Sequence, residues 1–458
     1  MKKYFLAVAS FFIYSHISLG QVYPGQMDST FVPVRSHHYD PELTFDFCVN
    51  EPAWSNQAGI HSAFGSTDRL YFRKEVPVNH DNDLSSSYST TVWRGERANA
   101  QILVWSSEAL EQVRVSTQDL RSAEGNIIPK DRITFELVRY VLSNYPYAEK
   151  KAICGESPYK SGFLMPDRFE TLDRFDLPSQ TTRPVWMLGD VPRGTAPGTY
   201  KGKVEVRAKG KAPQLLNLEI VVQNQLLPYP KDWKYRLDLW QNPWAVAWYN
   251  HVEPWSPQHK MLLKQHLKHY ADAGGTYITT YGVHSPWSDN SYMIEGGMIE
   301  WIKKADGTWA FDYKIFDEYV ELAMECGIDE AITLYTPIPW GFRHRYKDEA
   351  TGDYSYINWA PSSEEFKKMW NIFLTDFKFH LEAKSWLDIT YIGINENPME
   401  ETLAAIHVVR NHDKCWKITY AGNWHKELDG LLDDYSFLYG EEPTIAEQKA
   451  RAATGRTS

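Results

Sequence analysis

The stretch YIGINENPMEE, residues 391–401, joins a strand-like apolar run to a group of polar side chains. The run ends at Asn395 and Glu396, so it carries an amide and a carboxylate to one strand end. A carboxyl group placed there can transfer a proton to or from a bound substrate. Pro398 allows the strand to stop or bulge there. The side chain of Glu396 would then point to the same end of the strand as that of Asn395. The alternative interpretation is that Glu396 only caps a helix that begins near Met399.

Aromatic rings, amides, imidazoles and carboxylates follow the other expected strands of the C-terminal half. These strand-end residues are Trp240, Gln241, Asn242, His284, Trp287, Tyr335, Trp340, Asn423, Trp424, His425, Tyr439, Glu441 and Glu442. Such a lining suits a neutral, hydroxyl-rich ligand, because a phosphate would call for Arg, Lys or a glycine-rich loop. Taken singly, a Trp after a strand usually packs under a loop, and His284 can simply cap a turn before Pro286. Several strand ends with the same chemistry favour a shared binding site.

The composition limits the partners of the chain. Its 59 acidic residues exceed its 48 basic ones, and the net charge of −11 argues against nucleic acid or an anionic membrane as a partner. No HExxH, Walker A or GxSxG motif is present. His37 and His38 could ligate a metal, but no partner motif accompanies them, so we predict neither a metal nor another cofactor.

The N-terminal residues have the pattern of an export signal. Two lysines precede an apolar run at residues 4–14, and Ser18 and Gly20 follow at the spacing that signal peptidase prefers. We therefore expect a signal peptide at residues 1–20, a mature chain from about Gln21, and a periplasmic or extracellular location. No later run approaches about 18 apolar residues, so no transmembrane helix is predicted.

The cysteines suggest no structural framework. They are Cys48, Cys154, Cys326 and Cys415. Because they lie far apart and form no CxxC pair, neither a zinc ribbon nor a disulfide scaffold is indicated. Export permits a disulfide but does not require one.

Residues 21–225 have the pattern of a β-sandwich domain. The strand-like segments are residues 90–107, 183–208 and 215–225. Apolar and polar side chains alternate along them, and Gly and Pro turns separate them, which is typical of a sandwich rather than an α/β unit. Pro228 and Pro230 mark residues 226–234 as a linker.

Residues 235–458 alternate strands with helices. The expected strands are residues 235–241, 277–283, 330–338, 389–396, 417–423 and 434–440. The expected helices are residues 256–275, 311–326, 363–383, 399–410 and 444–455. This order predicts a parallel (β/α)8-type TIM barrel, whose chemistry lies at the C-terminal strand ends. Too few residues follow the fourth strand for eight units, so we expect a barrel without its last strands within a multidomain β plus α/β fold.

Several long stretches make the chain resemble glycoside hydrolase family 123, the exo-acting β-N-acetylgalactosaminidases. These stretches are WRGER (93–97), TRPVWMLGDVPRGTAPGTYKGKVEV (182–206), YRLDLWQNPWAVAWYNHVEPWSPQH (235–259) and FDYKIFDEYVELAMECGID (311–329). The resemblance implies a β-sandwich followed by a (β/α)8 barrel. It also implies hydrolysis of terminal β-linked N-acetylgalactosamine from glycans or glycosphingolipids, with retention of configuration and with the substrate's own acetamide as nucleophile.

The resemblance assigns roles to the residues of the opening stretch. Glu396 matches the family's general acid and base, and Pro398 also matches. Asn395 stands where the family has an Asp that orients the acetamide, and Asn397 replaces an Arg. A neutral Asn can accept the acetamide N–H but cannot balance positive charge, and loss of such a group typically costs about 10²- to 10³-fold in rate. The expected sugar-binding wall comprises Trp240, His284, Trp287, Tyr335, Trp340, Asn423 and Trp424.

Two alternatives follow from the same residues. The substitutions at Asn395 and Asn397, with the short C-terminal part, are compatible with a relative that binds amino sugars without cleaving them. The N-terminal sandwich could instead be an independent glycan-binding module, an idea that rests on fold analogy alone.

Overall fold

The computed structural model describes residues 51–77, 84–143, 163–234, 236–287, 296–438, 440 and 442–457. The expected signal peptide, His37, His38, Cys48, Cys154, Tyr439 and Glu441 lie outside these residues. The described chain divides into two compact units, one ending at Pro228 and the next beginning at Tyr229. Each unit has its own hydrophobic core.

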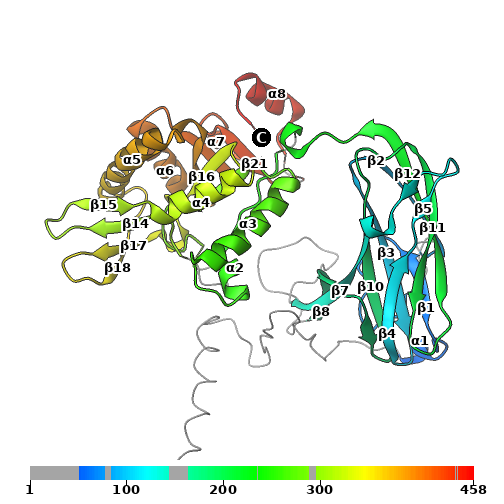
Figure 1. Ribbon diagram of the computed structural model, residues 1–458. Helices are drawn as coiled ribbons and strands as arrows, with labels where there is room; N and C mark the ends of the chain where they lie inside the picture. The colour runs from blue at the N-terminus through cyan, green and yellow to red at the C-terminus, as the bar shows by residue number, and fades with distance from the viewer. Residues whose placement is uncertain are drawn as a thin grey trace, which may run out of the picture. The chain divides into compact units, whose positions relative to one another are not determined.

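Two β-sheets pack against each other in the N-terminal unit (Figure 1). One sheet has the order β1 (His61–Gly65), β3 (Arg97–Ser106), β10 (Thr181–Asp190), β7 (Ile133–Ser143) and β8 (Phe163–Thr171). The other has the order β2 (Ser87–Arg94), β12 (Gln214–Leu226), β11 (Gly198–Arg207), β4 (Leu110–Thr117) and β9 (Phe175–Leu177), with β5 (Leu120–Arg121) paired to β11 and β6 (Ile127–Ile128) paired to β5. Along β11, Val204 and Val206 are buried while Lys203 and Arg207 are exposed. The expected β-rich N-terminal part is therefore confirmed.

A five-stranded parallel sheet forms the centre of the C-terminal unit. Its strands are β13 (Tyr277–Tyr281), β16 (Ala331–Tyr335), β19 (Thr390–Ile394), β20 (Lys417–Gly422) and β21 (Asp434–Phe437), adjacent in chain order. The longer helices are α3 (Pro257–Asp272), α4 (Lys314–Glu325), α5 (Glu364–Lys384) and α6 (Met399–His412), and the shorter ones are α2 (Pro243–Tyr249), α7 (Lys426–Asp429) and α8 (Ile445–Ala453). Leu334, Ile392 and Ile418 on the sheet and Phe316 and Phe377 on the helices are fully buried in one core.

Helix caps predicted from the sequence are present. Ser256 accepts a hydrogen bond from the backbone N–H of His259 at the start of α3, and Ser363 accepts one from Phe366 at the start of α5. The expected helices at residues 256–275 and 363–383 are thus confirmed within a few residues. None of the described helices combines the length and apolar character that a membrane crossing requires.

The expected first strand at residues 235–241 is wrong, apart from one bridge between Leu237 and Gly275. The hydroxyl of Tyr270 donates to the carbonyl of Leu237 at 2.7 Å and accepts from the N–H of Leu239 at 3.2 Å. These contacts occupy backbone groups that a strand ladder would use.

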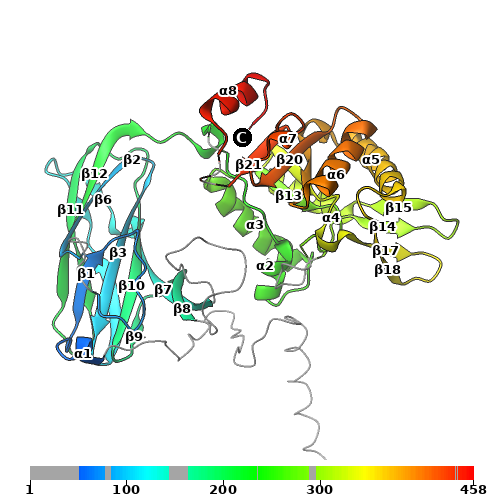
Figure 2. The ribbon, with the colours of Figure 1, turned by 180° about the vertical axis from the view of Figure 1, so that it is seen from behind.

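The closed TIM barrel is not confirmed, because the described residues form a curled half-barrel sheet (Figure 2). Beyond β21, Thr457 makes a single parallel bridge to Asp434.

A second sheet of four short strands lies beside the parallel sheet and was not predicted. It has the order β15 (Trp309–Asp312), β14 (Glu300–Lys303), β17 (Arg343–Asp348) and β18 (Tyr354–Asn358), and we call it the arm. Figures 1 and 2 show its two hairpins projecting from the side of the parallel sheet. Because β15 includes Phe311 and Asp312, the helix expected from residue 311 begins only at Lys314.

Candidate active site

The end of β19 holds Asn395 in a buried, partly satisfied position. The strand stops at Ile394, and Asn395 is only 5% exposed. The hydroxyl of Tyr335, at the end of β16, donates to Oδ1 of Asn395 at 2.5 Å. The backbone N–H of Asn395 donates to the hydroxyl of Thr336 at 3.2 Å. Its amide nitrogen Nδ2 has no hydrogen-bond partner among the described residues, so one buried donor is free for a ligand.

Glu396 lies next to this amide but is exposed. Its Oε1 accepts a hydrogen bond from the backbone N–H of Asn423 at 3.3 Å. A Cβ atom at Gly422 would lie 2.7 Å from Cγ of Glu396, so the missing side chain at 422 provides the space that Glu396 occupies. Helix α6 has Pro398 at its N-cap and no side-chain capping bond, so Glu396 does not cap this helix.

The charge of Glu396 affects the pKa values of three tyrosines. Burial raises the pKa of Tyr335 and of Tyr420, and the carboxylate of Glu396 raises both further. Burial also raises the pKa of Tyr435 to about 12, with a smaller contribution from Glu396. At neutral pH all three hydroxyls therefore keep their protons and can act as hydrogen-bond donors.

Aromatic rings form a wall beside Asn395. Trp287 stacks on Tyr335 with ring centroids 4.4 Å apart and 20° between the planes. Trp240 lies 5.6 Å from Trp287 and 5.1 Å from Tyr335. Because Trp240 is 45% exposed, part of its indole is open to a ligand. Four of the predicted site residues, Trp240, Trp287, Tyr335 and Asn395, thus gather in one place.

Trp424 and Asn423 lie on the other side of Glu396. The Trp424 ring is 5.1 Å from that of Tyr435, and the Asn423 carbonyl accepts the Tyr435 hydroxyl at 2.6 Å. Trp340 is less close to the wall: its backbone N–H donates to the Pro286 carbonyl at 3.2 Å, and its ring joins none of the ring stacks found among the described residues.

His284 is associated with the arm. Burial, together with the nearby cations Arg345 and Arg343, lowers its pKa to about 4, so the imidazole is neutral at physiological pH. Its Nδ1 has no hydrogen-bond partner among the described residues.

The remaining strand-end candidates have local structural roles. Oε1 of Gln241 accepts the backbone N–H of Thr279 at 3.3 Å, and Asn242 caps α2. His425 is the residue before α7, and Glu442 accepts the N–H of Gly440 at 2.8 Å. Within the described ranges, no three His, Cys, Asp or Glu side chains gather as a metal site requires.

The sequence analysis missed Tyr420 and Gly422. Ile394 pairs with Tyr420 in the β19–β20 ladder, and continuing that register brings Glu396 beside Gly422. A glycine beside a strand-end carboxylate would have indicated that space is kept for the carboxylate. It can be recognised only when the register between the two strands is known.

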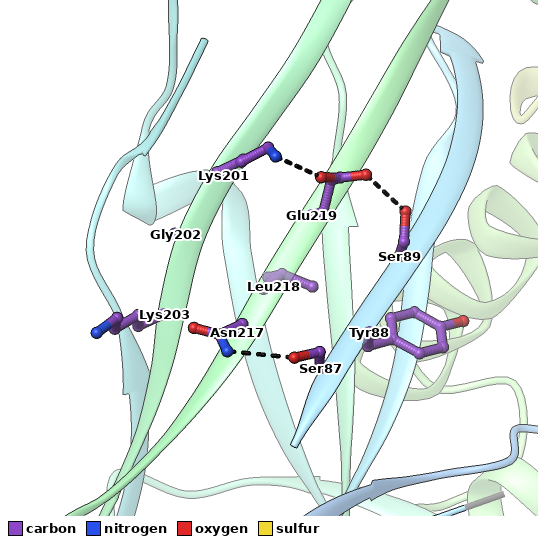
Figure 3. A pocket seen from close by; sticks show the side chains of 9 residues that line it. All are labelled: Ser87, Tyr88, Ser89, Lys201, Gly202, Lys203, Asn217, Leu218 and Glu219. Carbon is purple, nitrogen blue, oxygen red and sulfur yellow. Dashed lines mark hydrogen bonds and ion pairs between the residues drawn. The ribbon is translucent and has the colours of Figure 1, made fainter. Parts of the chain in front are cut away.

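A hollow on the surface of the N-terminal unit has few polar groups that could bind a ligand. It lies over β2, β12 and β11 (Figure 3). Glu219 pairs with Lys201 at 3.0 Å and accepts the Ser89 hydroxyl at 3.0 Å, and Asn217 donates to Ser87 at 3.2 Å. Since these polar groups satisfy one another, the hollow gives no support to a separate glycan-binding module.

Two family models match the chain. The model described as "Glycoside hydrolase 123 N-terminal domain" matches residues 64–208, and "Glycoside hydrolase 123, catalytic domain" matches residues 240–458. The chain belongs to glycoside hydrolase family 123. Membership supports glycosidase activity, and the match to the catalytic domain includes every residue of the wall, Asn395 and Glu396.

One solved structure shares the fold of this chain. A family 123 glycoside hydrolase from Clostridium perfringens, described in a study of glycolipid glycan hydrolysis, has a TM-score of 0.76 and 24% identity, covering 88% of this chain and 72% of that one. At this identity the likeness shows the fold alone. A xyloglucanase of family 5 from Bacteroides ovatus, with a TM-score of 0.21 and 9% identity over 78% of this chain and 68% of that one, carries no argument. A search of curated proteins found no match.

Proposed function

We propose that this family 123 chain removes terminal β-linked N-acetylgalactosamine from glycans or glycolipids. The observation that carries the proposal is the pair at the end of β19, a buried Asn395 with a free amide donor beside an exposed Glu396. Glu396 is proposed as the general acid and base, and Asn395 as the group that orients the substrate's acetamide.

The proposed reaction has two steps. In the first, Glu396 in its acid form gives its proton to the glycosidic oxygen, and the acetamide oxygen attacks C1 as the C1–O bond breaks. This forms an oxazolinium ion and releases the aglycone. In the second, the Glu396 carboxylate takes a proton from water, the water attacks C1, and the ring opens with overall retention. Since the substrate supplies the nucleophile, the usual spacing of two carboxylates does not apply.

Asn395 suits the positioning role but not the charge-balancing one. Oδ1 already accepts the Tyr335 hydroxyl and has a second lone pair for the acetamide N–H, while Nδ2 is free to donate to a substrate oxygen. The Tyr335 contact fixes the amide before substrate binds, which favours pre-organisation. A neutral amide stabilises the oxazolinium less than a carboxylate, so we expect a slow enzyme rather than an inactive one.

The sugar-binding wall is proposed to hold the N-acetylgalactosamine ring. The half-exposed indole of Trp240 suits stacking on pyranose C–H faces, with Trp287 and Tyr335 behind it. The other proposed members are His284, Trp340, Asn423 and Trp424.

Export is proposed from the N-terminal residues. The two lysines, the apolar run at residues 4–14 and the small residues Ser18 and Gly20 support it. Intact-mass analysis of protein secreted by an expressing bacterium should find a chain that begins near Gln21. A chain that keeps Met1 and stays in the cytoplasm would contradict this location.

The function is tested with two fluorogenic substrates that differ only at C2. We expect 4-methylumbelliferyl β-N-acetylgalactosaminide to be cleaved and 4-methylumbelliferyl β-galactoside, which lacks the acetamide, to remain intact. Equal cleavage of both would contradict a mechanism in which the substrate supplies the nucleophile.

A binding protein without turnover is the second candidate. It is favoured by Asn395 and by Asn397, whose Nδ2 donates to the Ile338 carbonyl at 3.1 Å and so supports the loop. Binding of N-acetylgalactosamine without cleavage, and without any gain of activity in Asn395→Asp, would support this candidate.

A further inference from the structure

One surface of the arm is strongly cationic. Arg343, Arg345 and Lys347 alternate along β17, and the ladder pairs Arg345 with Tyr356 and Lys347 with Tyr354 of β18. We call these five residues the cationic face. Tyr354 and Tyr356 are 50% and 52% exposed, and Arg343 and Lys347 are also exposed.

The other surface of the arm belongs to the hydrophobic core. Trp301 of β14 stacks on Phe373 of α5 with ring centroids 4.8 Å apart. His344 of β17 is 2% exposed and accepts the indole N–H of Trp370 at 3.3 Å. The arm is therefore held firmly on one side and presents the cationic face on the other.

The guanidinium groups make cation–π contacts with the tyrosine rings. Cζ of Arg343 lies 4.7 Å from the ring centroid of Tyr356, and Cζ of Arg345 lies 4.1 Å from that of Tyr354. A cation–π contact restrains the guanidinium group, and its N–H groups can still donate to a bidentate oxyanion. Nε of Arg345 is buried and has no hydrogen-bond partner among the described residues.

Few carboxylates oppose these cations. Glu300 of β14 lies 3.6 Å from Arg345 and also accepts the Tyr354 hydroxyl at 3.0 Å. Asp312, one strand farther away, accepts the backbone N–H of Lys314. The face thus keeps excess positive charge, although the whole chain has a net charge of −11.

The arm is attached to the strand ends that carry the candidate active site. The indole N–H of Trp301 donates to the carbonyl of Gly282, just after β13, at 2.9 Å. Trp340 follows β16, and its backbone N–H donates a hydrogen bond to the carbonyl of Pro286. Strand β17 begins three residues later, at Arg343. Arg343 and Arg345 also act electrostatically on His284. A glycan bound at the wall could therefore extend onto the cationic face.

We propose that the cationic face binds an anionic sugar, one that carries a carboxylate or a sulfate, on the aglycone side of the scissile bond. This inference rests on the proposed function. The paired N–H groups of a guanidinium match the paired oxygens of either group, and the tyrosine rings match the apolar face of a pyranose. The negative charge of the chain as a whole disfavours nucleic acid as the occupant.

The test compares Arg343→Gln/Arg345→Gln with the wild type on three substrates. These are a neutral, a sialylated and a sulfated oligosaccharide, each with a terminal β-N-acetylgalactosamine. We expect kcat/KM to fall about tenfold on at least one acidic substrate, less so in high salt, and to stay within about twofold on the neutral one. The two acidic substrates distinguish carboxylate from sulfate.

Two variants serve as controls. Lys303→Gln removes one positive charge from the opposite surface of the same sheet and should behave as wild type. Arg343→Lys/Arg345→Lys keeps both positive charges but loses the paired N–H groups of the guanidinium. On acidic substrates its kcat/KM should therefore lie between that of Arg343→Gln/Arg345→Gln and that of the wild type. Equal melting temperatures for all variants show that the fold is intact.

Binding measurements separate this inference from the proposed function. Titration calorimetry with a sialylated or sulfated oligosaccharide needs no turnover, so affinity lost in Arg343→Gln/Arg345→Gln supports the inference even if no substrate is cleaved. Cleavage of all three substrates with unchanged ratios in that variant would overturn the inference while leaving the function intact. Binding of anionic lipid vesicles, with none of the acidic oligosaccharides, would also overturn it.

Discussion

Gly422→Ala should disable Glu396 while leaving the protein folded. A Cβ atom at this position would lie 2.7 Å from Cγ of Glu396 and 2.7 Å from the Tyr420 hydroxyl, well inside van der Waals contact. Because Glu396 is exposed, its side chain can rotate away from the new methyl group. The carboxylate would then leave the position next to the backbone N–H of Asn423.

Gly422→Ala has two small and opposite effects on the free energy of unfolding. Replacing Gly by Ala reduces the entropy of the unfolded chain and stabilises by about 0.4–1 kcal/mol. An off-rotamer side chain costs about 0.5–1.5 kcal/mol, so the free energy of unfolding should change by less than about 1 kcal/mol. In contrast, moving a catalytic group by about 1 Å costs about 10²-fold in rate. We expect kcat to fall by about that factor and KM to change little.

The assay is hydrolysis of 4-methylumbelliferyl β-N-acetylgalactosaminide, with a thermal melt of each variant. Gly430→Ala is the matched control, since a Cβ atom there meets nothing within 4 Å and its φ of −74° suits any residue. In a Glu396→Gln background, Gly422→Ala should cause no further loss, because both changes act on one group. Wild-type kcat in Gly422→Ala, or a full additional loss in the double variant, would refute this reasoning.

Three further predictions use other parts of the C-terminal unit. Asn395→Asp should raise kcat on the same substrate by about 10²-fold, because a carboxylate balances the oxazolinium charge; a fall in kcat would count against the proposed role. Trp240→Ala should raise KM about tenfold with little change in kcat, as loss of a stacking surface predicts; an unchanged KM would remove Trp240 from the wall. Asp238 is half-buried, and desolvation together with the nearby charge of Asp434 raises its pKa to about 6. Because this folded-state pKa lies above the unfolded value, the associated stability is full below about pH 4 and is lost as the pH rises through 6. Asp238→Asn should therefore add about 2 kcal/mol to the free energy of unfolding at pH 7.5 and almost nothing at pH 4; urea titrations that show the same difference at both values would contradict this.

Local sequence signals predicted the parts of the fold that depend on neighbouring residues. The Ser256 and Ser363 caps and the alternation along β11 were read correctly because capping and burial patterns are local. The strand end at Asn395 and Glu396 was also visible, since an apolar run stops there before Pro398.

The features that were missed depend on distant partners. The first strand failed because the Tyr270 hydroxyl, more than thirty residues away, takes the backbone groups of Leu237 and Leu239. The arm consists of strands of four to six residues, too short for clear periodicity, although Asp306 and Gly307 at one hairpin tip are a turn signal. The role of Gly422 requires the register between β19 and β20.

The most direct measurement of the central claim is the rate at which Glu396→Gln cleaves 4-methylumbelliferyl β-N-acetylgalactosaminide. Glu400→Gln, an exposed carboxylate in the first turn of α6, is the matched control. If Glu396 is the acid and base, its variant should lose about 10³-fold in kcat/KM while Glu400→Gln stays near the wild type. Wild-type cleavage by a folded Glu396→Gln would contradict the account.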